Sequence, residues 1–189
     1  MNCEGSLKND MKRLAVIAVI LLMGCATISP GLKMIDKRAY LLVTAMDSQP
    51  VRDFFDITYE LDIHKVVIEI HSQGGPLFEA QRIVNLMQYW QSRGVTIETR
   101  VYGMALSAGF YIFVAGDRRL VSRDADLMWH TIQGVGDDAI LKHLQGIRHR
   151  YLASRGNLTV EELDEMVANR DIWMSGKDAV EYGFADGYL

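Results

Sequence analysis

Apolar residues along this chain follow two recurring patterns. Short runs that are almost wholly apolar predict buried strands, and stretches with apolar positions three or four residues apart predict amphipathic helices. Apolar runs of this kind lie at residues 39–46 and 66–70, and further strands are predicted at 95–102, 118–122 and 126–129. The helical pattern covers residues 52–61, 78–91, 137–154 and 176–182, and the small, apolar residues 107–115 predict a buried helix. Thr159 followed by Glu162 predicts a capping box that begins one further helix.

The alternation of strand and helix predicts an α/β fold. Strands joined by helices at this spacing imply right-handed βα crossovers, a parallel-sheet core and flanking helices. In such a sheet, functional groups gather at the carboxyl ends of the strands. Two strand ends carry unusual sequences, Ser72–Pro76 and Gly103–Gly109.

The N-terminal segment has a different character. An uncharged apolar run at residues 14–24 follows Lys12 and Arg13 and ends in Leu22-Met23-Gly24-Cys25. A basic start and an apolar run too short to span a bilayer are typical of a secretory signal. The last four residues resemble a bacterial lipobox, which implies that Cys25 is acylated. The alternative is that Cys25 is a small hydrophobic residue in an N-terminal helix.

This interpretation divides the chain into three parts. We expect a lipoprotein signal at residues 1–24, a linker at 25–38 and a folded domain at 39–189. The protein would then be a lipoprotein anchored on the extracytoplasmic, or periplasmic, side of a membrane. Met1 and Met11 are both compatible with this pattern as the start residue.

Composition and charge narrow the classes of function. The 189 residues suffice for one domain, and 49% hydrophobic with 23% charged residues is a globular composition that excludes a disordered chain or a coiled coil. The formal net charge of −4 provides no basic excess to neutralise phosphates, so we expect no nucleic-acid partner. Two cysteines cannot form a disulfide framework.

Ser107 is the first candidate for chemistry, because it lies among small residues where a predicted strand passes into a helix. There its hydroxyl can be exposed, and the N–H of Ala108 can face a developing oxyanion. The alternative is a simple helix cap.

The pair Gly74-Gly75 follows another strand and allows close approach to a ligand, or forms only a tight turn.

His130 and Asp171 are the candidates for a base and its partner. His130 ends a short apolar strand, where an imidazole can act as a general base or merely bond the backbone. Asp171 could orient a histidine or form a salt bridge with Arg170. Among the other histidines, His71 is the substitute for His130. His143 and His149 lie on the long predicted helix, and we expect both to be solvated.

The order of these motifs resembles the Clp protease proteolytic subunit family, with its ClpP/crotonase-like fold. The matching stretches are Val67–Gly75, Gly103–Gly109, Met128–His130, Arg170–Ser175 and Glu181–Asp186. The resemblance implies that Ser107 is the nucleophile, His130 the general base and Asp171 its orienting partner. It also implies that Gly75 and Ala108 donate the oxyanion-hole N–H groups, with Gly74 as the neighbouring alternative.

Two departures from the family pattern change what we expect. Thr131-Ile132 follows His130 where the family has Gln-Pro, which alters the substrate groove beside the base. The segment between His130 and Asp171 is shorter than in the family, in the region that pairs two rings. We therefore expect no two-ring barrel, and an exported protein would have no Clp-type ATPase as a partner.

The resulting hypothesis is a lipid-anchored serine endopeptidase that acts on peptides or unfolded segments. It assigns no cofactor and no metal site. We expect the domain to form a homo-oligomer. The alternatives are an acyl-transfer enzyme of the crotonase or thioesterase kind and a non-catalytic member of the same fold.

Overall fold

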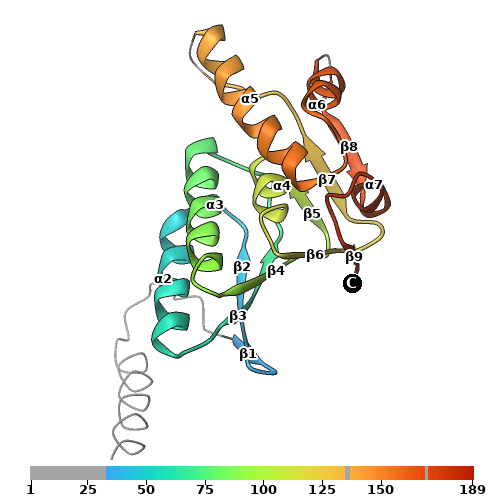
Figure 1. Cartoon of the computed structure of the whole chain (residues 1–189). Coiled ribbons are helices and arrows are strands. Elements are labelled where there is room, and N and C mark those ends of the chain that lie inside the picture. The colour runs from blue at the N-terminus through green and yellow to red at the C-terminus, as the bar shows by residue number, and fades with distance from the viewer. Residues whose placement is uncertain (1–32, 135–136, 169) are drawn as a thin grey trace, which may run out of the picture. The chain divides into compact units, whose positions relative to one another are not determined.

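The computed structural model describes residues 33–189 except 135, 136 and 169 (Figure 1). The strands are β1 (Lys33–Ile35), β2 (Arg38–Val43), β3 (Lys65–Ile70), β4 (Thr96–Val101), β5 (Met104–Leu106), β6 (Arg118–Val121), β7 (Asp126–Trp129), β8 (Ile172–Ser175) and β9 (Gly187–Tyr188). The helices are α2 (Ser48–Glu60), α3 (Leu77–Gln91), α4 (Ala108–Phe113), α5 (Asp138–Arg155), α6 (Val160–Val167) and α7 (Gly176–Glu181).

The larger sheet confirms the predicted α/β fold with a parallel core. Its strand order is β1-β2-β3-β4-β6-β9, and every neighbouring pair is parallel except β1 with β2. The register aligns Leu41 with Ile68 and Ile68 with Thr99, so alternate residues of three strands share one face. These three side chains are almost fully buried. This face therefore forms the core.

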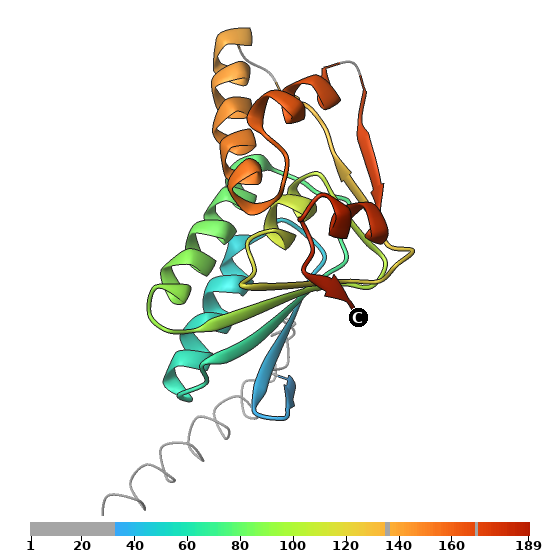
Figure 2. The same ribbon diagram turned by 45° about the vertical axis from the view of Figure 1, so that its right-hand side comes forward.

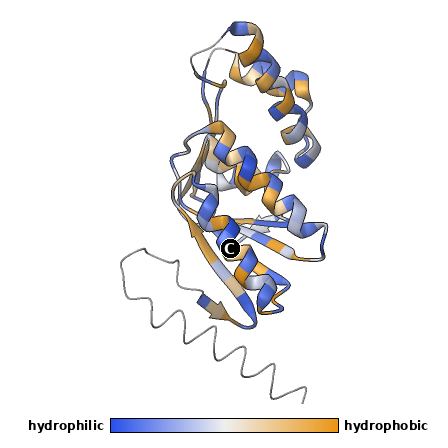
Figure 3. Ribbon diagram, turned by 90° about the vertical axis from the view of Figure 1, so that its left-hand side faces the viewer, coloured by the Kyte–Doolittle hydropathy of each residue, from blue (hydrophilic) through white to orange (hydrophobic). Residues whose placement is uncertain are grey.

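Helices α2 and α3 lie side by side against that face (Figures 1 and 2). Hydrophobic and hydrophilic positions alternate along both helices (Figure 3), because one side of each packs on the sheet and the other meets solvent. Helix α4 contacts α3 and β4 and is buried along its whole length. The buried α4 agrees with the small and apolar sequence from which it was predicted.

A second, smaller sheet was not predicted. It has the order β5-β7-β8, with β5 parallel to β7 and β8 antiparallel to β7. Strands β5 and β8 have only three and four residues, which is too short for a periodic signal. A parallel bridge between Ser72 and Ala105 connects this sheet to the end of β3. The candidate site is built where the two sheets meet.

Several local predictions needed correction. Residues 39–46 were predicted to form a buried strand, but β2 ends at Val43 and Leu42 is exposed on the outer face. Helix α2 begins four residues earlier than predicted, because Asp47 caps it and Pro50 lies in its first turn, where a proline is tolerated. Strand β1 begins at Lys33, within the segment predicted as a linker.

The prediction that His149 is solvated is wrong. His149 and its neighbour Arg148 are almost fully buried, whereas His143, on the same helix, is exposed as predicted. The C-terminal part of α5 packs against α6 and the rest of the domain, and its buried face includes Leu152. The capping box predicted at Thr159 is confirmed, and Ser175 begins α7 with a second capping box.

Candidate active site

Ser107 connects β5 to α4 in a conformation that is rare for a residue with a side chain. Its backbone has φ +54° and ψ −116°, and its side chain makes no capping hydrogen bond. The simple cap considered from the sequence is therefore not formed. A non-glycine residue held at positive φ costs free energy, and such residues concentrate at functional sites. The hydroxyl is left available for another partner.

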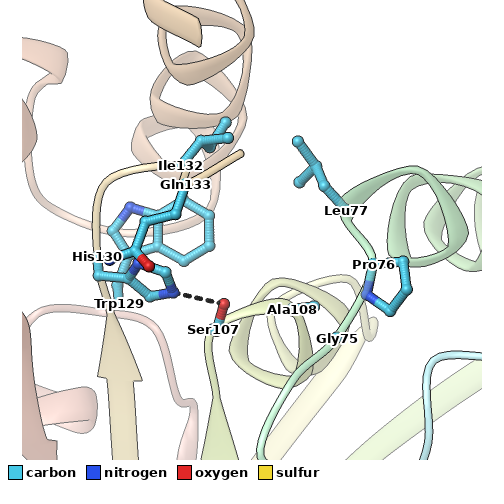
Figure 4. A pocket seen from close by; sticks show the side chains of 9 residues that line it. All are labelled: Gly75, Pro76, Leu77, Ser107, Ala108, Trp129, His130, Ile132 and Gln133. Carbon is cyan, nitrogen blue, oxygen red and sulfur yellow. Dashed lines mark hydrogen bonds between the residues drawn. The ribbon is translucent and has the colours of Figure 1, made fainter. Parts of the chain in front are cut away.

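That partner is His130, which directly follows β7. The parallel pairing of β5 with β7 aligns the ends of the two strands, and the Ser107 N–H donates to the Met128 carbonyl at 2.8 Å. The Ser107 Oγ and the His130 Nε2 lie 2.8 Å apart, within hydrogen-bond distance (Figure 4). Two residues that are 23 positions apart in the sequence thus form one polar pair.

The turn after β3 brings backbone N–H groups close to this pair. The Ser72 N–H donates to Met104 O at 3.2 Å and the Leu106 N–H donates to Ser72 O at 2.9 Å, so the turn is bonded to β5. The Gly74 N–H donates to the buried Ser72 Oγ at 3.2 Å. Within the described residues, no hydrogen bond uses the N–H of Gly75 or of Ala108. These two groups are free to bind a ligand, whereas that of Gly74 is occupied.

Gly74 also provides the strongest stability prediction for the site. It has φ +100°, and a Cβ there would lie 2.8 Å from the Ser107 Cβ and 2.9 Å from the Leu106 carbonyl oxygen. We expect Gly74→Ala to lower the free energy of unfolding by more than backbone strain alone. Gly94 is the matched control, because it has φ +86° and open space around it.

In urea unfolding, Gly94→Ala should cost about 1–2 kcal/mol through its positive φ. Gly74→Ala should cost about 1–3 kcal/mol more through overpacking against backbone atoms. Equal losses for the two variants would contradict the close contact between Gly74 and Ser107.

A pocket of about 160 Å³ opens over the polar pair. In Figure 4, Ser107 and Ala108 lie at its base, with Pro76 and Leu77 on one side and Trp129, Ile132 and Gln133 on the other. Gly75 and His130 complete the lining. Its walls are thus mainly apolar, and its hydrogen-bonding groups gather at the base. Ile132 belongs to the segment where the sequence departs from the family pattern.

Asp171 and His130 are neighbours across strands β8 and β7, but their side chains form no hydrogen bond. The register of β7 with β8 pairs Trp129 with Ile172, and its continuation by one step sets Asp171 opposite His130. The Asp171 side chain is exposed. Among the described residues, the buried Nδ1 of His130 has no hydrogen-bond partner. His71, the substitute base, is exposed and lies beside Gly103.

Sequence reasoning missed the α5 residues that hydrogen-bond the chain on either side of His130. The Trp129 indole N–H donates to the His149 Nε2 at 2.9 Å, and the Ile132 N–H donates to the Gln145 Oε1 at 2.6 Å. Burial lowers the pKa of His149, and Asp164 opposes that effect. The spacing of Gln145, His149 and Leu152 by four and three residues was the available signal, because it places all three on one helix face.

A serine hydroxyl paired with an imidazole, beside two free backbone N–H groups, is the arrangement that serine hydrolases use. The fold and the site therefore place this chain among α/β proteins with a serine-hydrolase geometry. The model of the Clp protease family matches residues 33–189, and the chain belongs to that family.

The curated relatives agree with this assignment. The ATP-dependent Clp protease proteolytic subunit of Streptococcus agalactiae serotype V is 29% identical over 137 residues, covering 66% of this chain and 68% of the relative. The protein of the same description from Streptococcus pyogenes serotype M5 is 31% identical over 134 residues, covering 64% and 66%.

Proposed function

We propose that this protein is a serine peptidase in which Ser107 is the nucleophile and His130 the general base. The observation that carries the proposal is the 2.8 Å approach of the Ser107 Oγ to the His130 Nε2. A serine hydroxyl is a weak nucleophile at neutral pH and needs such a base. Membership in the Clp protease family supports peptide hydrolysis as the reaction.

In the proposed first step, the Ser107 Oγ attacks the carbonyl carbon of the scissile peptide bond while the His130 Nε2 takes the hydroxyl proton. The carbonyl oxygen becomes an oxyanion, which the N–H groups of Gly75 and Ala108 stabilise. His130 then gives the proton to the departing amine as the carbon–nitrogen bond breaks. Water, activated by the same base, hydrolyses the resulting ester and restores the Ser107 hydroxyl.

We propose Asp171 as the residue that orients His130. The strand register supports this role, since Asp171 stands opposite the base on the neighbouring strand. A rotation of its exposed side chain toward the free Nδ1 of His130 would form the missing hydrogen bond. That bond would hold the proton on Nδ1 and leave Nε2 free to accept the serine proton.

The pocket supports a peptide substrate with an apolar side chain next to the cleaved bond. Leu77 and Ile132 face each other across the opening (Figure 4), and Trp129 adds an aromatic surface. Among the described residues that line the pocket, His130 is the sole ionisable side chain, so they provide no permanently charged partner for a charged group of a substrate. We propose unfolded segments or short peptides as the class of substrate.

A fluorophosphonate probe tests the proposal, because it phosphonylates a serine only when a base activates it. The intact protein should be labelled, and peptide mapping should place the label on Ser107. A labelled protein that cleaves thioesters and no peptide would favour an acyl-transfer enzyme. A protein that is neither labelled nor active on peptides would be a non-catalytic member of the family.

We propose further that Cys25 carries a lipid that anchors the protein to a membrane. Cys25 and the signal at residues 1–24 lie outside the described residues. The support is the sequence, in which Lys12 and Arg13, an apolar run and Leu-Met-Gly-Cys follow one another. None of the helices described between residues 33 and 189 is long and apolar enough to cross a bilayer.

Metabolic labelling with a fatty-acid analogue should mark the wild-type protein in its native bacterial host and leave Cys25→Ser unlabelled. Cys3→Ser is the matched control and should be labelled like the wild type. Wild-type protein should also sediment with membranes. Equal labelling of wild type and Cys25→Ser would contradict acylation at this residue.

We also propose that copies of this chain associate. Large apolar side chains are exposed on the domain, among them Phe78 at 70% and Trp173 at 60%, and symmetric closure would cover such surfaces. Light scattering on the protein in detergent, with the detergent contribution subtracted, measures the number of chains. We propose no Clp-type ATPase as a partner of this assembly, because an exported protein would be separated from it.

A further inference from the structure

His149 on α5 is fully buried, yet its ring meets three polar partners. The Trp129 indole N–H donates to Nε2 at 2.9 Å, the Gln145 amide nitrogen also meets Nε2, and Nδ1 lies 2.5 Å from the Asp164 Oδ1. An indole N–H is only a donor, so Nε2 must be the acceptor. The single proton of the neutral ring is therefore on Nδ1 and is donated to Asp164.

These contacts reach the chain on both sides of the proposed base. Trp129 directly precedes His130, and the Ile132 N–H two residues after it donates to the Gln145 Oε1. The Gln145 amide nitrogen also donates to His149 Nε2, where it shares the single lone pair with the Trp129 N–H. One buried imidazole thus connects the two flanks of His130 to α5 and, through Asp164, to α6.

The base itself has little else to hold it. Its Nδ1 has no hydrogen-bond partner in the described part of the chain, and its one side-chain hydrogen bond is to the Ser107 Oγ. Its orientation then depends on the backbone that carries it. That backbone also supplies Trp129 and Ile132 to the pocket wall.

We propose that His149 is a positioning residue for the general base. It holds Trp129 directly and Ile132 through Gln145, and so fixes the segment 129–132 that carries His130 and forms one wall of the pocket. The inference rests on the proposed function of His130, but the hydrogen bonds that it invokes can be measured without any catalysis.

The arrangement requires a neutral His149. Asp164 faces the ring from α6 and Trp129 from β7, while Arg148 precedes it on α5 and Tyr111 of α4 stacks on Trp129. A second proton on Nε2 would turn this nitrogen into a donor. It could then no longer accept from the indole N–H or from the Gln145 amide, and both contacts would be lost.

The direction of the pH effect follows from burial, which lowers the pKa of His149 below its usual value. The unfolded chain then binds a proton more readily than the folded one. The contribution of this group to stability is therefore complete above the unfolded pKa of about 6.5 and is lost as pH falls through the lowered folded pKa.

Three variants separate positioning from simple packing. His149→Gln keeps an acceptor near the position of Nε2 but cannot titrate. His149→Leu keeps the volume and removes the acceptor. His143→Gln is the matched control, because His143 lies on the same helix and is exposed. Circular dichroism of each purified variant checks that it folds.

The first measurement is the rate at which a small fluorophosphonate labels Ser107. We expect His149→Leu to be labelled about 100-fold more slowly than the wild type, because small displacements of a catalytic group have costs of this order. His149→Gln should recover to within about tenfold of the wild-type rate, and His143→Gln should match the wild type. Wild-type labelling of folded His149→Leu would overturn the proposal.

The second measurement is the indole N–H resonance of Trp129, assigned by its absence in Trp129→Phe. In the wild type it should shift with a midpoint below pH 6.5, as should the backbone amide of Ile132. Both shifts should persist in His143→Gln and disappear in His149→Gln. Their persistence in His149→Gln would refute the connection. If the wild type is never labelled, the peptidase proposal fails, and these two resonances alone decide whether His149 holds the segment.

Discussion

Ser107→Ala is expected to abolish peptide hydrolysis, with a loss in kcat on the order of 10⁶-fold. The variant removes the oxygen that lies 2.8 Å from the His130 Nε2 and leaves the base without a hydroxyl to activate. Folding should be preserved, because the Ser107 side chain makes no capping hydrogen bond and its loss leaves no large cavity. Fluorogenic peptides measure the rate, and circular dichroism verifies the fold.

Ser92→Ala is the control for this experiment. Ser92 is exposed at the end of α3, where its hydroxyl donates to the Tyr89 carbonyl. Its replacement should leave both hydrolysis and fluorophosphonate labelling at the wild-type level. If folded Ser107→Ala kept wild-type peptidase activity, the nucleophile would be another residue, and the geometry at the end of β5 would have a different purpose.

His130→Ala should be about as damaging as the loss of the nucleophile. Without the imidazole, the Ser107 hydroxyl must release its proton to water, and the departing amine has no acid. The double variant Ser107→Ala/His130→Ala should be no worse than either single variant, since two residues that act as one unit have non-additive effects. Rates with the same fluorogenic peptides give the double-mutant cycle.

Asp171→Asn tests the proposed orienting residue with the same peptides, and its loss of rate is compared with that of His130→Ala. It should cost no more than His130→Ala, and about 10⁴-fold at most, because an orienting partner fixes the tautomer without taking part in proton transfer. Multiplicative losses in the double Ser107/His130 variant would show that the two residues act separately and would contradict the proposed pair. A loss at His71→Ala equal to that at His130→Ala would point to the substitute base instead.

The sequence was sufficient to predict the sheet core and the candidate groups. The apolar run 66–70 became β3, as expected for a strand buried in the middle of a parallel sheet. Residues 95–102 contain β4, in which Thr96, Glu98, Thr99 and Arg100 are polar. Helix starts at Thr159 and Ser175 were predictable because their capping residues act within three positions of the chain. Such local interactions can be predicted from residues that are close together in the sequence.

The meeting of Ser107 with His130 was predicted only through the resemblance to a family, since the two are joined by pairing between distant strands. Strand β5 has three residues, and neither its length nor its composition distinguishes it from a loop. The free N–H of Gly75, and the use of Gly74 by Ser72, depend on how the turn after β3 bonds to β5.

His149 is the clearest example of a side chain whose environment the sequence did not predict. Its residue type and its place on a polar helix predicted a solvated side chain, but contacts with β7 and α6 bury it and assign both ring nitrogens. Local patterns determine which segments become helices and strands, because those preferences act between neighbouring residues. Which polar groups meet, and which remain unpartnered, depends on contacts between residues far apart in the chain, and only the tertiary structure decided that.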